Sequence, residues 1–474
     1  MYRLKKVGSL SPKAASQLKS SRLGIGFEKL DRDAFDPEKA YDKLAAVGVK
    51  WIRIQSGWAK TEKQEGVYDF EWLDSIVDNL ISRGMIPWMC MCYGNSLYTE
   101  EAKEVYGSVG CPPIHTEQEK KAWHDYCVAT AKHFSGRITH FEVWNEPDGK
   151  WCWKHGPNAT ELGQFTVDTA RALRKGNPDV YVIGGSICQI TSSIAYLQKA
   201  FQTGMADAID GLSFHEYLYY ETNVSQRVRA LRGLFNLREK KIDIIQGESG
   251  SQSRPFGYGA LRLGGWTPRK QAKQLLRHAT ADLLADVKFT SFFSCLDMKE
   301  ALNGTVDDKA SYQDYGYFGI LGADFDENGF ATGEYTPKPS YYALQNIASL
   351  LGGDLVTMDL PVVFSTKSLD MVDHIGDLPP VRYHEALSGG FRLDNGSYAF
   401  AYWKPCELMT TEYEGATVLH ASIPCDEVHL VDPMDGAIYE IPETIMTVDD
   451  VGNRIFKDIP IKDYPLFLVF GKIE

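Results

Sequence analysis

Eight short apolar segments, rich in residues that favour strands, recur through the first two thirds of the chain. They cover residues 23–27, 51–55, 86–92, 138–144, 180–184, 211–215, 242–246 and 289–295. Each gap between them is long enough for one crossover helix. Strands that are apolar on both faces and alternate with helices indicate a parallel sheet covered on both sides. The sequence therefore predicts an α/β fold with a closed (β/α)8 TIM barrel.

An open, doubly wound sheet is the alternative that this pattern leaves. It is disfavoured because no Gly-x-Gly-x-x-Gly motif follows the first segment.

The segments between the strands carry helix signals. Asp36 and Pro37 are typical of a helix start, and Gly48 is typical of a helix end. Asn158, with Glu161 one helical turn later, predicts a second helix start.

The pattern changes after a helix-like run at residues 341–351. Short strand-like segments follow at residues 355–364, 389–393, 398–403, 417–421, 427–431, 437–441 and 466–470. Turn-forming pairs such as Asn395-Gly396 and Asp435-Gly436 separate them. We therefore expect a barrel over residues 11–351 and a smaller all-β sandwich over residues 352–474, which residues 1–10 join.

The acidic balance of the chain limits its partners. A formal net charge of −13 repels nucleic acid and anionic membranes. The sequence has no apolar run typical of a membrane span or a signal peptide. Nine cysteines without disulfide-framework or zinc spacing favour a reducing compartment. We expect a cytoplasmic protein with neither nucleic acid nor membrane as partner, and the sequence leaves a homo-oligomer open.

Carboxylates are prominent where the predicted barrel strands end, which is where barrel active sites are built. They are Glu28, Glu146, Asp148, Glu216, Glu248 and Asp297. Glu146 follows the fourth strand and Glu248 the seventh, so we expect the two to face each other across the barrel mouth. Glycoside hydrolysis needs such a pair, one carboxyl to protonate the leaving oxygen and one to attack or to activate water.

The segment Trp144-Asn145-Glu146-Pro147, together with Glu248, resembles the glycoside hydrolases of clan A. A barrel followed by a β-sandwich is most similar to glycoside hydrolase family 39, as are two further segments, Lys338-Pro339-Ser340-Tyr341-Tyr342 and Tyr402-Trp403. The resemblance implies a retaining glycosidase, of β-xylosidase or related β-glycosidase type, with a carbohydrate substrate. It implies that Glu146 is the acid/base and Glu248 the nucleophile.

The same resemblance implies roles for residues near the pair. Asn145 would donate a hydrogen bond to the 2-hydroxyl of the sugar, and His215 would line the site. Tyr217 would hydrogen-bond the nucleophile, and Arg53 would keep Glu248 ionised. Elementary electrostatics agrees, because a nearby cation and a hydroxyl donor both favour the charged form of a carboxyl group.

Aromatic side chains at strand ends are candidates for contact with sugar C–H surfaces. They are Trp58, Trp88, Tyr93, Trp144, Trp151, Trp153 and Trp266. The eighth segment lacks the tryptophan that forms a platform under the sugar in the clan, and we expect Trp266 to replace it. Glu28 and Trp144, both at strand ends, complete the predicted substrate-binding set.

Other functions and cofactors are less consistent with the sequence. A barrel lyase or aldolase would use a strand-end lysine as a Schiff base, whereas Lys288 lies at the start of the eighth segment and no lysine was found at a strand end. A non-catalytic carbohydrate-binding protein would not need both carboxylates. Met89-Cys90-Met91-Cys92 is typical of core and Asp324 of a solvated acidic loop, so we expect no metal and no cofactor. The sugar, the linkage and exo or endo action stay open.

Overall fold

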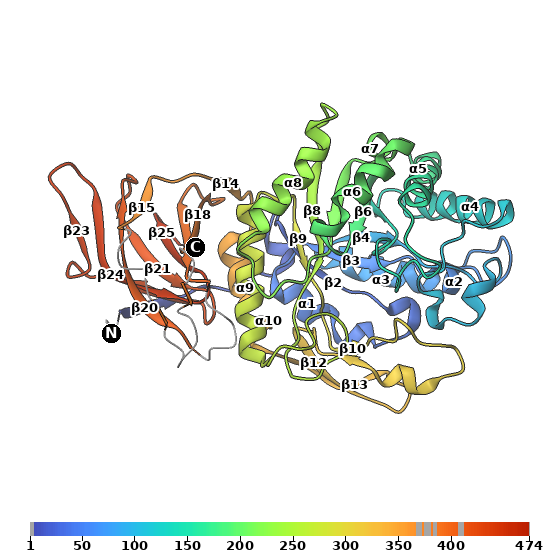
Figure 1. Cartoon of the computed structure of the whole chain (residues 1–474). Coiled ribbons are helices and arrows are strands. Elements are labelled where there is room, and N and C mark those ends of the chain that lie inside the picture. The colour runs from blue at the N-terminus through green and yellow to red at the C-terminus, as the bar shows by residue number, and fades with distance from the viewer. Residues whose placement is uncertain (1–3, 366–371, 374–380, 383–385, 406–411, 474) are drawn as a thin grey trace.

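The computed structural model describes residues 4–365, 372–373, 381–382, 386–405 and 412–473. Its N-terminal part is a closed barrel of eight parallel strands, on the right in Figure 1. The strands are β2 (Leu23–Gly26), β3 (Trp51–Gln55), β4 (Ile86–Met91), β5 (His140–Val143), β6 (Tyr181–Ile187), β7 (Gly211–Phe214), β8 (Asp243–Ser249) and β9 (Thr290–Phe292). Each overlaps one predicted segment, which confirms the predicted barrel.

Helices connect the barrel strands on the outside. They are α1 (Tyr41–Val47), α2 (Trp58–Thr61), α3 (Glu71–Ser82), α4 (Glu117–His133), α5 (Ala159–Gly176), α6 (Ile190–Ala200), α7 (Met205–Ala208), α8 (Val224–Asn236), α9 (Pro268–Leu284) and α10 (Pro339–Leu351). Short 3₁₀ turns lie at Ala15–Gln17, Leu30–Arg32, Pro37–Lys39, Glu100–Lys103, Tyr106–Ser108, Phe201–Thr203 and Lys309–Gln313.

The helix signals act as expected. The side chain of Asn158 accepts hydrogen bonds from the backbone N–H groups of Thr160 and Glu161 and so begins α5. Asp36 caps a 3₁₀ turn, and α1 follows directly. Gly48 ends α1 at a φ of 85°, a left-handed conformation that favours glycine.

Two antiparallel hairpins extend the chain after the last barrel strand. They are β10 (Met298–Lys299) with β11 (Tyr315–Gly316), and β12 (Leu321–Phe325) with β13 (Ala331–Pro337).

The C-terminal part consists of two larger antiparallel sheets and a two-stranded one. The seven-stranded sheet has the order β1-β22-β21-β25-β19-β18-β14, the four-stranded sheet β15-β20-β24-β23, and β16 pairs with β17. Their bounds are β1 (Lys5–Ser9), β14 (Val356–Met358), β15 (Val362–Phe364), β16 (Val372–Asp373), β17 (Val381–Arg382), β18 (Leu387–Arg392), β19 (Tyr398–Trp403), β20 (Glu414–Ala421), β21 (Val428–Asp432), β22 (Ala437–Glu440), β23 (Met446–Val448), β24 (Arg454–Lys462) and β25 (Leu466–Phe470). The predicted β-sandwich is confirmed, and β1 from the N-terminus pairs with β22.

The sandwich differs from the prediction around Pro361 and in strands that the sequence analysis missed, among them the short pair β16 and β17. Residues 355–364 form two strands in different sheets, β14 and β15, because Pro361 between them cannot continue a ladder. The strands β23 and β24 were missed. Polar and charged residues interrupt the apolar pattern of β24, and its Pro460 is a residue that argues against a strand.

Each cysteine in the described part of the chain is a free thiol, and Cys406 lies outside the described residues. Among the residues described, no helix combines the length and the apolarity that a membrane crossing requires.

Helix α9 lies between the barrel and the sandwich, so nearly all of its side chains are buried (Figure 1). Arg277 on this helix pairs with Glu221 at 2.9 Å, and both side chains are fully buried. The indole of Trp403, from sandwich strand β19, donates to the same carboxylate at 2.7 Å. Lys273 pairs with Asp463 at 2.9 Å in the same interface. Buried charges therefore connect the two domains.

We predict that Glu221→Ala lowers the free energy of unfolding by about 3–5 kcal/mol, because it leaves the buried Arg277 without its carboxylate. Urea-induced unfolding would measure the change. The matched control is Glu100→Ala, which removes an exposed ion pair with Lys103 and should cost less than about 1 kcal/mol. Equal small losses in the two variants would show that the interface pair does not stabilise the fold.

Candidate active site

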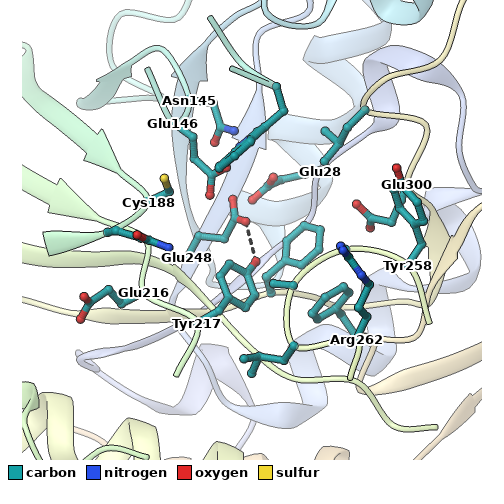
Figure 2. A pocket seen from close by; sticks show the side chains of 18 of the residues that line it. Glu28, Asn145, Glu146, Cys188, Glu216, Tyr217, Glu248, Tyr258, Arg262 and Glu300 are labelled. Atoms are coloured by element: carbon teal, nitrogen blue, oxygen red, sulfur yellow. Dashed lines mark hydrogen bonds between the residues drawn. The ribbon is translucent and has the colours of Figure 1, made fainter. Parts of the chain in front are cut away.

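A cavity of about 610 Å³ opens at the carboxyl ends of the barrel strands. Figure 2 shows that the labelled side chains converge on it from several strands. Its lining includes Glu28, Lys29, Arg32, Tyr93, Asn145, Glu146, Trp151, Cys188, Glu216, Tyr217, Arg227, Glu248, Tyr258, Arg262, Phe293, Glu300 and Phe318. The volume is typical of a site for a small molecule.

Arg53 on β3 lies beneath the cavity, fully buried, and its guanidinium connects four residues. Its Nη1 donates to Glu28 at 3.0 Å and to Glu248 at 2.8 Å. Its Nε and Nη2 donate to Glu142 at 2.8 and 2.6 Å, and Nη2 also donates to Asn145 at 2.8 Å. Burial lowers the pKa of Arg53, but Glu142 and Glu28 outweigh that effect and hold it well above its ordinary value. The group is therefore a permanent cation.

Glu248 lies near the end of β8 and points into the cavity (Figure 2). Arg53 binds its Oε2, and the Tyr217 hydroxyl donates to its Oε1 at 2.5 Å. Burial and the negative charge of Glu28 raise the pKa of Glu248 to about 7, against the lowering effects of His215 and Arg53. Both oxygens are thus fixed, and the carboxyl changes charge near neutral pH.

Glu146 follows β5 on a strained turn. Its φ is 44° and that of Trp144 is 66°, a left-handed region that is costly for residues other than glycine. The indole of Trp151 donates to Glu146 Oε2, and the backbone N–H of Glu146 donates to Ser186 at 3.0 Å. The turn directs the Glu146 carboxyl towards that of Glu248.

His215 lies between the two carboxylates and is fully buried. Its Nδ1 is 3.5 Å from Glu146 Oε1 and 3.7 Å from Glu248 Oε2, and its Nε2 is 3.6 Å from Glu142. Burial lowers the pKa of His215, but the negative charge of Glu248 and the nearby carboxylates of Glu142 and Glu146 outweigh this and raise the pKa to about 10. A ring nitrogen of His215 and one oxygen each of Glu146 and Glu248 lie within 4.8 Å of one another.

The sequence analysis missed Glu142, a fully buried carboxylate in the middle of β5. Burial raises its pKa, but Arg53 and His215, with the Ser213 hydroxyl, lower it to about 2. A signal was available, because a charged residue inside an apolar strand must have a partner when buried. Glu142 is therefore the permanent counter-ion of Arg53.

Two expected sugar contacts lie elsewhere. Trp144 is fully buried, its indole donates to the Cys152 carbonyl, and it does not line the cavity. Trp266 is also buried, because its indole donates to the Leu261 carbonyl and its ring stacks on Tyr219. Neither tryptophan is therefore a platform under a sugar, and the role expected of Trp266 is corrected.

The remaining strand-end residues differ in their positions. Glu28 lines the cavity, and so does Glu216, which is paired with Arg227. Asp148 accepts from Ser193, and Asp297 pairs with Lys338 at 2.6 Å outside the cavity lining. Lys29, which follows Glu28, is a strand-end lysine that the sequence analysis did not identify. It lines the cavity, where its side chain contacts Glu300 at 2.8 Å.

A metal is disfavoured at the centre of this site, although Glu146, His215 and Glu248 have the composition of a ligand set. With its pKa raised to about 10, the His215 ring is protonated at neutral pH and offers no lone pair. Arg53, 2.8 Å from Glu248, already supplies the positive charge that this carboxylate needs. The arrangement suits two carboxylates that act on a neutral ligand.

Comparison with known proteins gives a consistent match. The sequence model of the glycosyl hydrolases family 39 matches residues 39–378. A family 39 glycoside hydrolase from Bacteroides cellulosilyticus WH2 has a TM-score of 0.64 at 17% identity, covering 95% of this chain and 80% of its own. A monomeric beta-xylosidase from Caulobacter crescentus CB15 has a TM-score of 0.58 at 14% sequence identity, and the match covers 97% of each chain. A family 30 endoxylanase from Clostridium papyrosolvens C71 has a TM-score of 0.56 at 11% sequence identity, and the match covers 98% of this chain and 100% of that protein's chain.

We predict that Glu28→Gln moves the acidic limb of the kcat/KM profile on an aryl glycoside to lower pH by about one pH unit. A carboxylate that acts in its ionised form loses activity as the pH drops through its pKa, which is about 7 for Glu248. Removing the charge of Glu28 stabilises the ionised form and lowers that pKa. The control is Glu216→Gln, which alters the same cavity without touching Glu248 and should leave the limb unmoved. A limb that stays in place in Glu28→Gln would contradict the coupling.

Proposed function

The chain belongs to glycosyl hydrolase family 39, and on this premise we propose that it is a retaining β-glycosidase. Glu248 is the nucleophile and Glu146 the acid/base. The observation that carries the proposal is the approach of the two carboxylates, which have oxygens within 4.8 Å of each other across the barrel mouth. Retaining enzymes hold their carboxyls about 5–5.5 Å apart, whereas inverting ones need room for a water.

In the first step, Glu146 gives its proton to the glycosidic oxygen while Glu248 attacks the anomeric carbon. The bond from that carbon to the leaving oxygen breaks, its electron pair stays on the oxygen, and the leaving group departs as an alcohol. The sugar is then bonded to Glu248 through an ester-like linkage.

In the second step, Glu146, now ionised, takes a proton from a water that attacks the same carbon, and Glu248 leaves as a carboxylate. The charge of Glu248 is consumed in the first step and returned in the second. Because this charge lies next to Glu146, Glu146 stands beside a carboxylate when it acts as an acid and beside a neutral ester when it acts as a base.

The surrounding contacts support these roles. Arg53 is a cation that donates a hydrogen bond to Glu248, and both effects stabilise the carboxylate form of Glu248. Arg53 also binds Asn145 Oδ1, which turns the amide nitrogen of that residue away and leaves it as a donor to a sugar hydroxyl. The amide nitrogen of Asn145 donates a weak hydrogen bond to Cys152 Sγ at 3.4 Å.

The cavity and the relatives support a proposal for the substrate class. A space of about 610 Å³ suits a monosaccharide unit with a short aglycone. The Caulobacter crescentus relative is a beta-xylosidase, so β-xylosides are the first substrates to test, followed by glucosides, galactosides and arabinosides. A lyase that uses Lys29 as a Schiff base is disfavoured, because the Lys29 side chain is held in an ion pair with Glu300 at 2.8 Å.

We predict that Glu248→Gly abolishes turnover of dinitrophenyl β-glycosides and that azide restores it with a glycosyl azide of inverted configuration. Azide enters the space of the missing carboxylate and attacks from the same face. Proton NMR of the first-formed product identifies the anomer, and the unaltered enzyme should release a sugar of retained configuration. A glycosyl azide of retained configuration from Glu248→Gly would mean that Glu248 is not the nucleophile.

We predict that Glu146→Ala loses about 10²–10⁴-fold in rate on alkyl glycosides, whose leaving groups need a proton. Dinitrophenyl glycosides need none, so their first-step rate should be nearly unchanged and a burst of dinitrophenol should appear. Azide should then give a product of retained configuration, the opposite of Glu248→Gly. Equal losses on the two substrate types would move the acid role to another residue.

A further inference from the structure

We propose that Glu101, His115 and His155 form a zinc site on the rim of the barrel mouth, separate from the catalytic carboxylates. One ligand atom from each residue lies within 4.8 Å of the other two, and all three side chains are exposed. His115 Nε2 is 3.6 Å from Glu101 Oε1, and the two imidazole rings are 4.9 Å apart. This spacing lets the three groups share one small ion with only small side-chain movements.

The residue types favour zinc over the alkaline-earth ions. Zn²⁺ binds imidazole nitrogens and carboxylate oxygens with four ligands, whereas Ca²⁺ and Mg²⁺ take oxygen ligands. Two histidines and one glutamate leave the fourth position for water. Glu161 lies 3.0 Å from His155 Nε2. A carboxylate next to a ligating histidine orients the ring and raises its basicity.

The site would connect two loops of the barrel mouth. Glu101 and His115 belong to the segment between β4 and α4, and His155 belongs to the segment between β5 and α5. A backbone hydrogen bond of 2.9 Å from Lys154 to Gly110 already joins these segments.

The second segment also carries Glu146 and Trp151, whose indole donates to that carboxylate. Zinc would therefore restrain the loop that holds the acid/base without touching the cavity. The environment differs from that of Glu146, His215 and Glu248, where the Arg53 guanidinium already contacts Glu248 at 2.8 Å.

Isothermal titration of the full chain with Zn²⁺ tests the site. We expect one ion per chain and a rise in the melting temperature with zinc but not with Ca²⁺. His115→Gln and His155→Gln should each weaken binding by about tenfold or more and remove the thermal shift, since even outer-shell changes cost about 10–100-fold. His124→Gln, a histidine of α4 that pairs with Asp125 outside the cluster, is the matched control and should bind as the unaltered chain does.

The outcomes separate the proposal from its alternatives. Without added metal, each variant should keep the glycosidase activity of the unaltered chain, which shows that the variant is folded. If one histidine variant fails to fold, Glu101→Gln takes its place in the titration. The absence of saturable binding, or unchanged binding in both histidine variants, would overturn the site. Binding lost in Glu248→Gln and kept in His115→Gln would place the ion in the catalytic cavity and also overturn it.

Discussion

The buried guanidinium of Arg53 is the interaction on which the site depends. It contacts carboxylates from three other segments of the barrel, Glu28, Glu142 and Glu248, and only a closed barrel brings these segments together. Removing one member of such a network leaves an uncompensated charge in a medium of low dielectric, which is strongly destabilising. The closure of the barrel and the assembly of the site are therefore one event.

One cation gives its carboxylates different properties because it binds them unequally. Glu142 receives two hydrogen bonds from Arg53 and one from Ser213, and its pKa falls to about 2. Glu248 receives one from Arg53 and lies near two other glutamates, and its pKa rises to about 7. The first carboxylate neutralises the cation at any physiological pH. The charge of the second depends on pH near neutrality, and only its ionised form can attack a carbon.

The sequence predicted what depends on local pattern and missed what depends on packing. The eight barrel strands, the cap at Asn158 and the strand-end positions of Glu146 and Glu248 all follow from periodicity, capping and turn chemistry. The burial of Trp266 could not be predicted, because it depends on how its loop folds back on Tyr219. The ion pair that connects the domains, Lys273 with Asp463, joins residues far apart in sequence and was equally hidden.

The eighth strand shows how loops adapt a fixed scaffold. Phe293 follows this strand, whose segment carries no tryptophan, and it packs edge-to-face against Phe318 at 5.5 Å in the cavity wall. Trp151, from the segment after β5, lines the same cavity, and its indole hydrogen-bonds Glu146. The position of this indole is therefore coupled to that of the Glu146 carboxyl. Because loops vary while barrel strands stay fixed, we expect the β5–α5 segment to influence substrate choice under the proposed function.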